Sequence, residues 1–140
     1  MPVEASIKTE LKRSSGSTFA TIYVEKENDL IFIDWDGFLS VDQVKEGSEE
    51  LLKIFKSVGG ISKILVNNQK VTGPWSKAND WYVNDWNPRA IKAGLKHMAV
   101  IESENIFTQL SLQGFQKVTS GFETQRFIGE DKARGWLKSA

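Results

Sequence analysis

The stretch LIFIDW at residues 30–35 decides the fold class, because its apolar side chains do not alternate with polar ones. Two shorter runs repeat this feature later in the chain, ILV at 64–66 and MAVI at 98–101. Short apolar runs of this kind are typical of strands covered on both faces of a parallel sheet. We therefore expect the three runs to lie side by side in the middle of one sheet.

Two further strands are expected at the margins of this sheet. Residues 19–25 alternate between two faces, and the turn-like residues 27–29 connect them directly to the run at 30–35. A connection this short favours an antiparallel pair, so the first strand should form one edge of the sheet. Residues 122–128 have the mixed pattern of a strand at an edge.

Helical segments separate the later strands. Ser40 and Gln43 form a predicted capping box at the start of a helix that Gly59 ends. The Gly73-Pro74 pair should start the second helix, with proline at its first position, and Asn87-Pro88 should end it. A turn closing at Gly94 follows.

Two more helices complete the pattern. The third is expected over residues 106–118, and a short final helix should begin at Glu130, with Ala133, Trp136 and Leu137 on its inner face. The order β-β-α-β-α-β-α-β-α predicts an α/β fold with a mixed, mostly parallel five-stranded sheet packed with helices. Residues 1–17 are expected to be a flexible N-terminal segment and residues 18–140 a single domain.

Composition limits the possible functions. Lys and Arg (18) balance Asp and Glu (18), so the chain lacks the basic excess of a nucleic-acid-binding protein. It has no cysteine, which excludes thiol catalysis and cysteine-based zinc sites. The sequence shows neither a signal-peptide pattern nor an apolar run of about 20 residues, the length that crosses a bilayer. We expect a cytoplasmic protein without a transmembrane segment.

Two patches and the order of elements resemble a known family. One is Gly94-Leu95-Lys96 leading into residues 97–100, and the other is Arg126-Phe127 followed by the A-x-x-W-L pattern at 133–137. Together they resemble the STAS fold, and more closely its SpoIIAA-like branch of small bacterial proteins, the anti-sigma-factor-antagonist type. The resemblance covers residues 19–140. It implies a non-enzymatic protein-interaction module that docks a partner protein or itself.

The resemblance also implies a position for a phosphoswitch. In the family, a serine in a motif of the form D-S-[ST]-G begins the helix after the third strand, and its phosphate adds about −1.5 to −2 charge where a partner docks. The corresponding stretch here is VTGPWSK at 71–77, without the acidic residue and the following glycine. Thr72 and Ser76 are the candidate phosphosites, and the missing residues argue against the switch.

The wider superfamily contains lipid-binding domains of the CRAL-TRIO type, which gives an alternative function. A small carrier would hold an apolar or lipid-like ligand between the second and third helices and the sheet. An internal apolar cavity above about 300 Å³ would favour this alternative.

Aromatic residues gather in the second helix. Trp75, Tyr82 and Trp86 fall on one helical face, which favours a core face but also makes them candidates for a partner or ligand surface. Trp81 lies off that face. It would either pack against a neighbouring segment or anchor a partner, because tryptophan is enriched in binding hot spots.

Polar residues follow the central strands. In parallel sheets the carboxyl ends of the strands form the usual ligand edge, so these residues could line one polar rim. The candidates are Asp34, Asp36, Asn67, Asn68 and Glu102. Carboxylates and amides could hold Mg²⁺ or support an enzyme, whereas turn and cap positions also favour Asp and Asn.

No motif in the sequence predicts a cofactor or a catalytic triad. There is no phosphate-binding glycine loop, and His97 is the single histidine, placed just before an apolar strand. We therefore expect no catalytic residues, no resident metal and no cofactor, and an uncharacterised enzyme is the weakest of the three functions.

Overall fold

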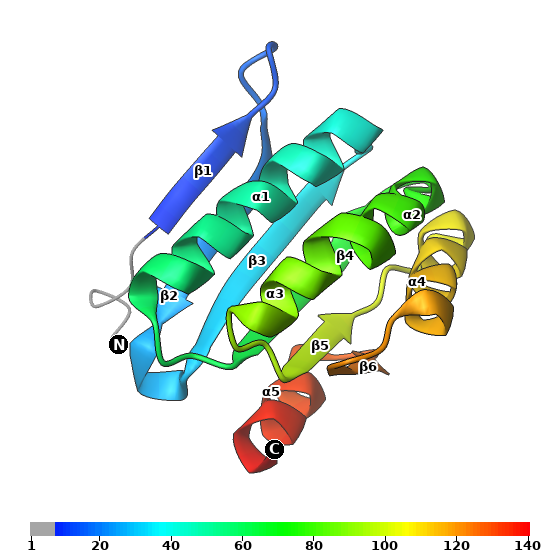
Figure 1. The fold of residues 1–140 in the computed structure, drawn as a ribbon. Coiled ribbons are helices and arrows are strands. Elements are labelled where there is room, and N and C mark those ends of the chain that lie inside the picture. Colours follow the sequence, from blue (N-terminus) through cyan, green and yellow to red (C-terminus); the bar gives the residue numbers. More distant parts are fainter. Residues whose placement is uncertain (1–7) are drawn as a thin grey trace.

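The computed structural model describes residues 8–140, which form one six-stranded sheet with helices on both faces (Figure 1). The strands lie in the sheet in the order of the sequence. They are β1 (Lys8–Lys12), β2 (Thr18–Glu25), β3 (Leu30–Gly37), β4 (Lys63–Val71), β5 (His97–Ile101) and β6 (Glu123–Phe127). The first two pairings are antiparallel and the remaining three are parallel, so the α/β class with a mixed, mostly parallel sheet is confirmed.

The prediction for the middle of the sheet is confirmed. Ile31 pairs with Ile64, and Ile64 pairs with Met98 on the next strand. The strands β3, β4 and β5 are thus parallel neighbours, with helices on both sides. This explains why their apolar runs do not alternate.

The predicted strand count is wrong, because residues 8–12 form a sixth strand within the segment we expected to be flexible. Leu11 pairs with Ala20, and its side chain packs against the main core. The predicted edge strand, β2, is therefore an inner strand, and β1 is the edge. Leu11 is the single large apolar side chain in KTELK, so the pattern gave little signal. Residues 1–7 lie outside the described part of the chain.

The first helix, α1 (Val41–Val58), follows β3 and begins as predicted. Gln43 donates its backbone N–H to the Ser40 hydroxyl at 3.1 Å, and Ser40 donates its own N–H to the Gln43 side chain at 3.0 Å. The capping box satisfies two backbone donors that the first helical turn would leave free. Between β2 and β3 the chain makes only the short 3-10 turn η2 (Lys26–Asn28).

The second helical segment differs from prediction at both ends. It is a continuous run of η3 (Ser76–Ala78), α2 (Asn79–Trp81), η4 (Tyr82–Trp86) and α3 (Asn87–Lys92). It begins at Ser76 rather than at Gly73-Pro74, and it continues through Asn87-Pro88. The run tolerates Pro88 because η4 is a π-helical turn, in which the Asn87 N–H bonds the carbonyl of Tyr82.

The helices are divided unequally between the two faces. The helix α1, the run from η3 to α3, and α4 (Ile106–Val118) cover one face, which holds the larger core. Among residues 8–140, only α5 (Glu130–Ser139) covers the other face, where Ala133 and Leu137 are buried and Trp136 is partly buried. The predicted inner face of the last helix is thus confirmed. No helix in residues 8–140 has the length and apolarity needed to span a membrane.

Candidate functional site

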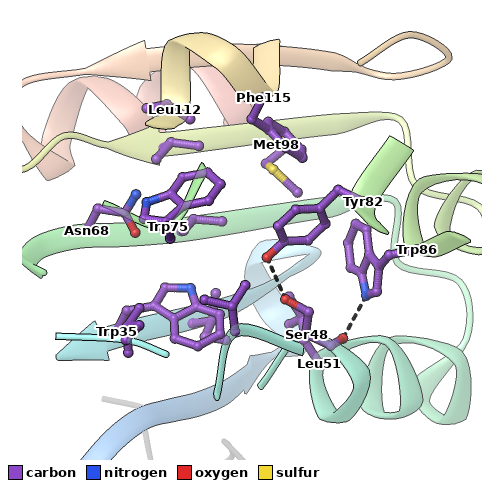
Figure 2. A pocket seen from close by; sticks show the side chains of 15 residues that line it. Trp35, Ser48, Leu51, Asn68, Trp75, Tyr82, Trp86, Met98, Leu112 and Phe115 are labelled. Atoms are coloured by element: carbon purple, nitrogen blue, oxygen red, sulfur yellow. Dashed lines mark hydrogen bonds between the residues drawn. The ribbon is translucent and has the colours of Figure 1, made fainter. Parts of the chain in front are cut away.

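The aromatic residues of the second helical segment line a pocket on the three-helix face. Trp75, Tyr82 and Trp86 lie on the same side of the segment and face α1 and the sheet (Figure 2). Trp86 is buried, whereas Trp75 and Tyr82 are partly buried. The pocket between them has a volume of about 50 Å³. A lipid-like ligand would need a cavity of about 300 Å³ or more, so this volume does not favour the carrier.

Ser48 of α1 fixes one end of the pocket. Its hydroxyl lies 2.6 Å from the Tyr82 hydroxyl, and its carbonyl accepts a hydrogen bond of 2.7 Å from the indole N–H of Trp86 (Figure 2). Although part of the Tyr82 ring reaches the surface, burial raises the pKa of Tyr82 to about 12. The phenol is therefore neutral at physiological pH, and it acts here as a hydrogen-bonding group.

The opposite end of the pocket carries Asn68, which we expected on a polar rim with Asn67. The two residues are consecutive in β4, so their side chains point to opposite faces of the sheet. Asn68 is only 4% exposed and lines the pocket beside Trp75 (Figure 2). Its expected place on the rim is therefore wrong.

Polar side chains of α4 hold the loop that leads into the pocket wall. Ser111 accepts the Trp75 backbone N–H at 2.9 Å, and Thr108 donates its hydroxyl to the Gly73 carbonyl at 2.7 Å. Both side chains are buried, and Leu112 and Phe115 share their inward face. The sequence pattern missed Thr108 and Ser111, because small polar residues resemble a solvent-exposed face. These bonds fix the position of Trp75.

The remaining rim residues form pairs rather than one cluster. Asp34 accepts a hydrogen bond of 3.3 Å from Asn67 and an ion pair of 2.9 Å from Lys70, which raises the pKa of Lys70. Asp36 is exposed, and Glu102 lies 3.7 Å from Arg126. In residues 8–140, no three His, Cys, Asp or Glu side chains meet in a way that could hold a metal ion.

Trp81 is neither fully exposed nor part of the pocket lining. Its ring lies 5.2 Å from the Tyr82 ring, and the Lys45 ammonium lies 5.8 Å from its centroid. A partly buried ring with a cation beside it matches a packing role.

The two candidate phosphosites are both exposed. Ser76 is the first residue of η3, and Thr72 lies just after β4 with its backbone N–H bonded to the Gly37 carbonyl at 3.1 Å. The helix that begins at Ser76 has no side-chain cap. Modification of either residue remains a prediction.

His97 has a structural environment. Its ring packs at 5.6 Å against Trp136 of α5, and its Nε2 lies 3.3 Å from a Glu123 carboxylate oxygen on β6. His97 is the first residue of β5, as its place before an apolar run predicts.

Exposed apolar side chains gather at the carboxyl ends of the central strands. Phe38, Ile106, Phe107 and Leu110 are each 52–61% exposed, and we call these four residues the apolar edge surface. The Phe38 ring lies next to Gly73, whose carbonyl also accepts the Thr108 bond from α4. The loop and the first turns of α4 thus bring the four side chains to one edge. Sequence spacing identified the helix but not its exposed apolar side.

No protein-family model and no curated protein sequence matches this chain.

Proposed function

We propose that this protein is a non-enzymatic interaction module of the STAS, SpoIIAA-like type, and that it docks through the apolar edge surface. The observation that carries this proposal is the exposure of Phe38, Ile106, Phe107 and Leu110. Large apolar side chains that gather at one edge are typical of interaction sites. This surface adjoins the loop before the second helix, which the resemblance implies as the docking region.

The partner that we propose is a second copy of the chain. In a symmetric dimer the same surface on both copies is covered at once, which removes both sets of apolar side chains from water. Four side chains supply only part of the roughly 800 Å² that each partner buries in a standard interface. The dimer should therefore be weak and reversible.

Sedimentation velocity over a concentration series tests this proposal. We expect a monomer at low micromolar concentration and a rise toward the dimer mass as the concentration approaches about 1 mM, a range that corresponds to weak association. Phe107→Asp should weaken the association at least tenfold, because it places a charge in the interface.

Val118→Asp is the matched control. Val118 is also exposed on α4, but it lies at the other end of the helix, so its replacement should leave the association unchanged. A wild-type chain that stays monomeric throughout, or equal effects of the two substitutions, would contradict the proposal.

A further inference from the structure

The pocket on the three-helix face has an unusual composition. Its walls are almost entirely apolar, with Asn68 at one end and the Ser48–Tyr82 pair at the other (Figure 2). Within residues 8–140, no charged side chain lines it.

The two polar ends differ in how they are satisfied. The Ser48 and Tyr82 hydroxyls bond each other at 2.6 Å. By contrast, none of the side-chain hydrogen bonds found within residues 8–140 involves the Asn68 amide, although Asn68 is 4% exposed and its neighbour Asn67 is bonded twice. Within residues 8–140, the fully buried side-chain atoms without a hydrogen-bond partner belong to Asn79, Asn87, His97 and Thr124, and the Asn68 amide is not among them. The two donors and the acceptor of Asn68 therefore stay reachable from the pocket that it lines, where they can bond a molecule that enters.

The volume limits the size of that partner. One water molecule needs about 10–15 Å³ and a benzene-binding cavity has about 150 Å³. The pocket, at about 50 Å³, lies between these values. It therefore fits a group of a few heavy atoms. Trp75 and Tyr82 are the lining residues that are partly exposed, so a larger molecule would extend past them to solvent.

The wall that contains Trp75 and Tyr82 is also the least regular part of the fold. Trp75 precedes the 3-10 turn η3, and Tyr82 begins the π-helical turn η4. Such turns are frequent at functional sites. A molecule that enters past these two rings would thus contact an irregular helical segment.

We propose that this pocket binds a small uncharged molecule whose amide-type group pairs with Asn68 and whose apolar part lies among the tryptophan rings. An amide offers both a donor and an acceptor, which complements the two functions of the Asn68 side chain. A carboxylate or ammonium group would be buried without a countercharge, which is strongly unfavourable. The site is separate from the apolar edge surface, and it does not depend on self-association.

Propionamide is the probe, with propionate as a charged molecule of the same size. Trp35, Trp75 and Trp86 line the pocket, so tryptophan fluorescence and the indole N–H signals in NMR spectra report on binding. We expect propionamide to shift the signals of these tryptophans with a Kd of about 1 mM, typical of a weak fragment, and propionate to bind at least tenfold more weakly. A pocket that holds only water would show no shift well above that concentration, and this result would overturn the proposal.

Two substitutions of consecutive asparagines sharpen the test. Asn68→Leu should weaken propionamide binding at least tenfold, because it removes the amide that pairs with the probe. Asn67→Leu is the control: it breaks the bonds to Asp34 and to the Gln69 backbone, so it should lower Tm and leave binding unchanged. Unchanged binding in Asn68→Leu would refute the role of Asn68. Should this variant fail to fold, Asn68→Ala must likewise weaken binding at least tenfold.

Discussion

The two faces of the sheet are built differently, although they share the same strands. On the three-helix face, a large core surrounds a pocket that Asn68 lines and that has an irregular helical wall. On the other face, α5 alone forms a small apolar cluster over β3, β4 and β5. That cluster includes Leu65 and Ala99, which are both fully buried.

The margin of the second face is covered mainly by side chains. Arg134 of α5 lies 5.6 Å over the Phe32 ring, and Tyr23 stacks on that ring at 5.7 Å. Asp34 and Lys70 form an ion pair on the neighbouring strands β3 and β4. Here, pairs of neighbouring side chains cover the sheet in place of a layer of helices. The three-helix face thus holds a pocket within its core, whereas the other face holds a small apolar cluster beside local side-chain pairs.

The largest difference in stability is expected between two tryptophan-to-alanine variants, one on each face of the sheet. Trp86→Ala should destabilise the protein by about 4 kcal/mol, because the indole is fully buried and its N–H bonds the Ser48 carbonyl. Trp136→Ala removes a partly buried ring from the smaller cluster and should cost about half as much. Urea unfolding of both variants measures the difference, and equal losses would contradict the unequal division of the core.

Helical glycines on the two faces should respond with opposite signs. A Cβ on Gly47 of α1 would collide with the Trp35 ring in the pocket wall, whereas a Cβ on Gly135 of α5 meets open space. Gly47→Ala should therefore destabilise the protein by about 2 kcal/mol through overpacking. Gly135→Ala should stabilise it by about 0.5–1 kcal/mol through helix propensity. Thermal unfolding of the pair checks this, and a stabilising Gly47→Ala would show that α1 does not rest on Trp35.

Most of the fold could be predicted because its signals are local. The runs at 31–33 and 64–66, the capping box at Ser40 and the A-x-x-W-L pattern each identify one element from neighbouring residues. The strand β1 escaped prediction because its stability depends on pairing with β2. The continuous helix through Pro88 escaped because a π-helical turn compensates for the missing N–H, and spacing alone does not reveal such a turn.

The candidate site was predictable only in part. The shared face of Trp75, Tyr82 and Trp86 follows from helical spacing. Strand alternation would have predicted Asn67 and Asn68 on opposite faces of the sheet, had both residues been assigned to β4 rather than to the loop after it. The apolar edge surface could not be predicted, because α4 turns its polar Thr108 and Ser111 inward to bind the backbone of the preceding loop.

The smallest losses of stability are expected when either of two ion pairs is broken, one on each face of the sheet. Arg134 of α5 donates to both Glu25 carboxylate oxygens at 2.8 and 2.9 Å, and these hydrogen bonds lower the pKa of Glu25. Hydrogen bonds from Arg89 likewise lower the pKa of Glu49 on α1, but this pair is more exposed. Glu25→Gln should therefore cost about 1 kcal/mol at pH 7, and Glu49→Gln less than about 0.5 kcal/mol.

The pH dependence separates the Glu25 ion pair from a packing effect. A carboxylate whose pKa is lower in the folded state contributes its full stability above its unfolded pKa of about 4.5, and it loses this contribution as the pH falls through the folded pKa. The difference in unfolding free energy between wild type and Glu25→Gln should thus be largest at pH 7 and shrink steadily below pH about 4.5. Urea unfolding at pH 7, 5 and 3 measures it. A difference that does not change with pH would mean that Arg134 holds α5 through its contact with Phe32, over which its guanidinium lies at 5.6 Å, and not through the carboxylate.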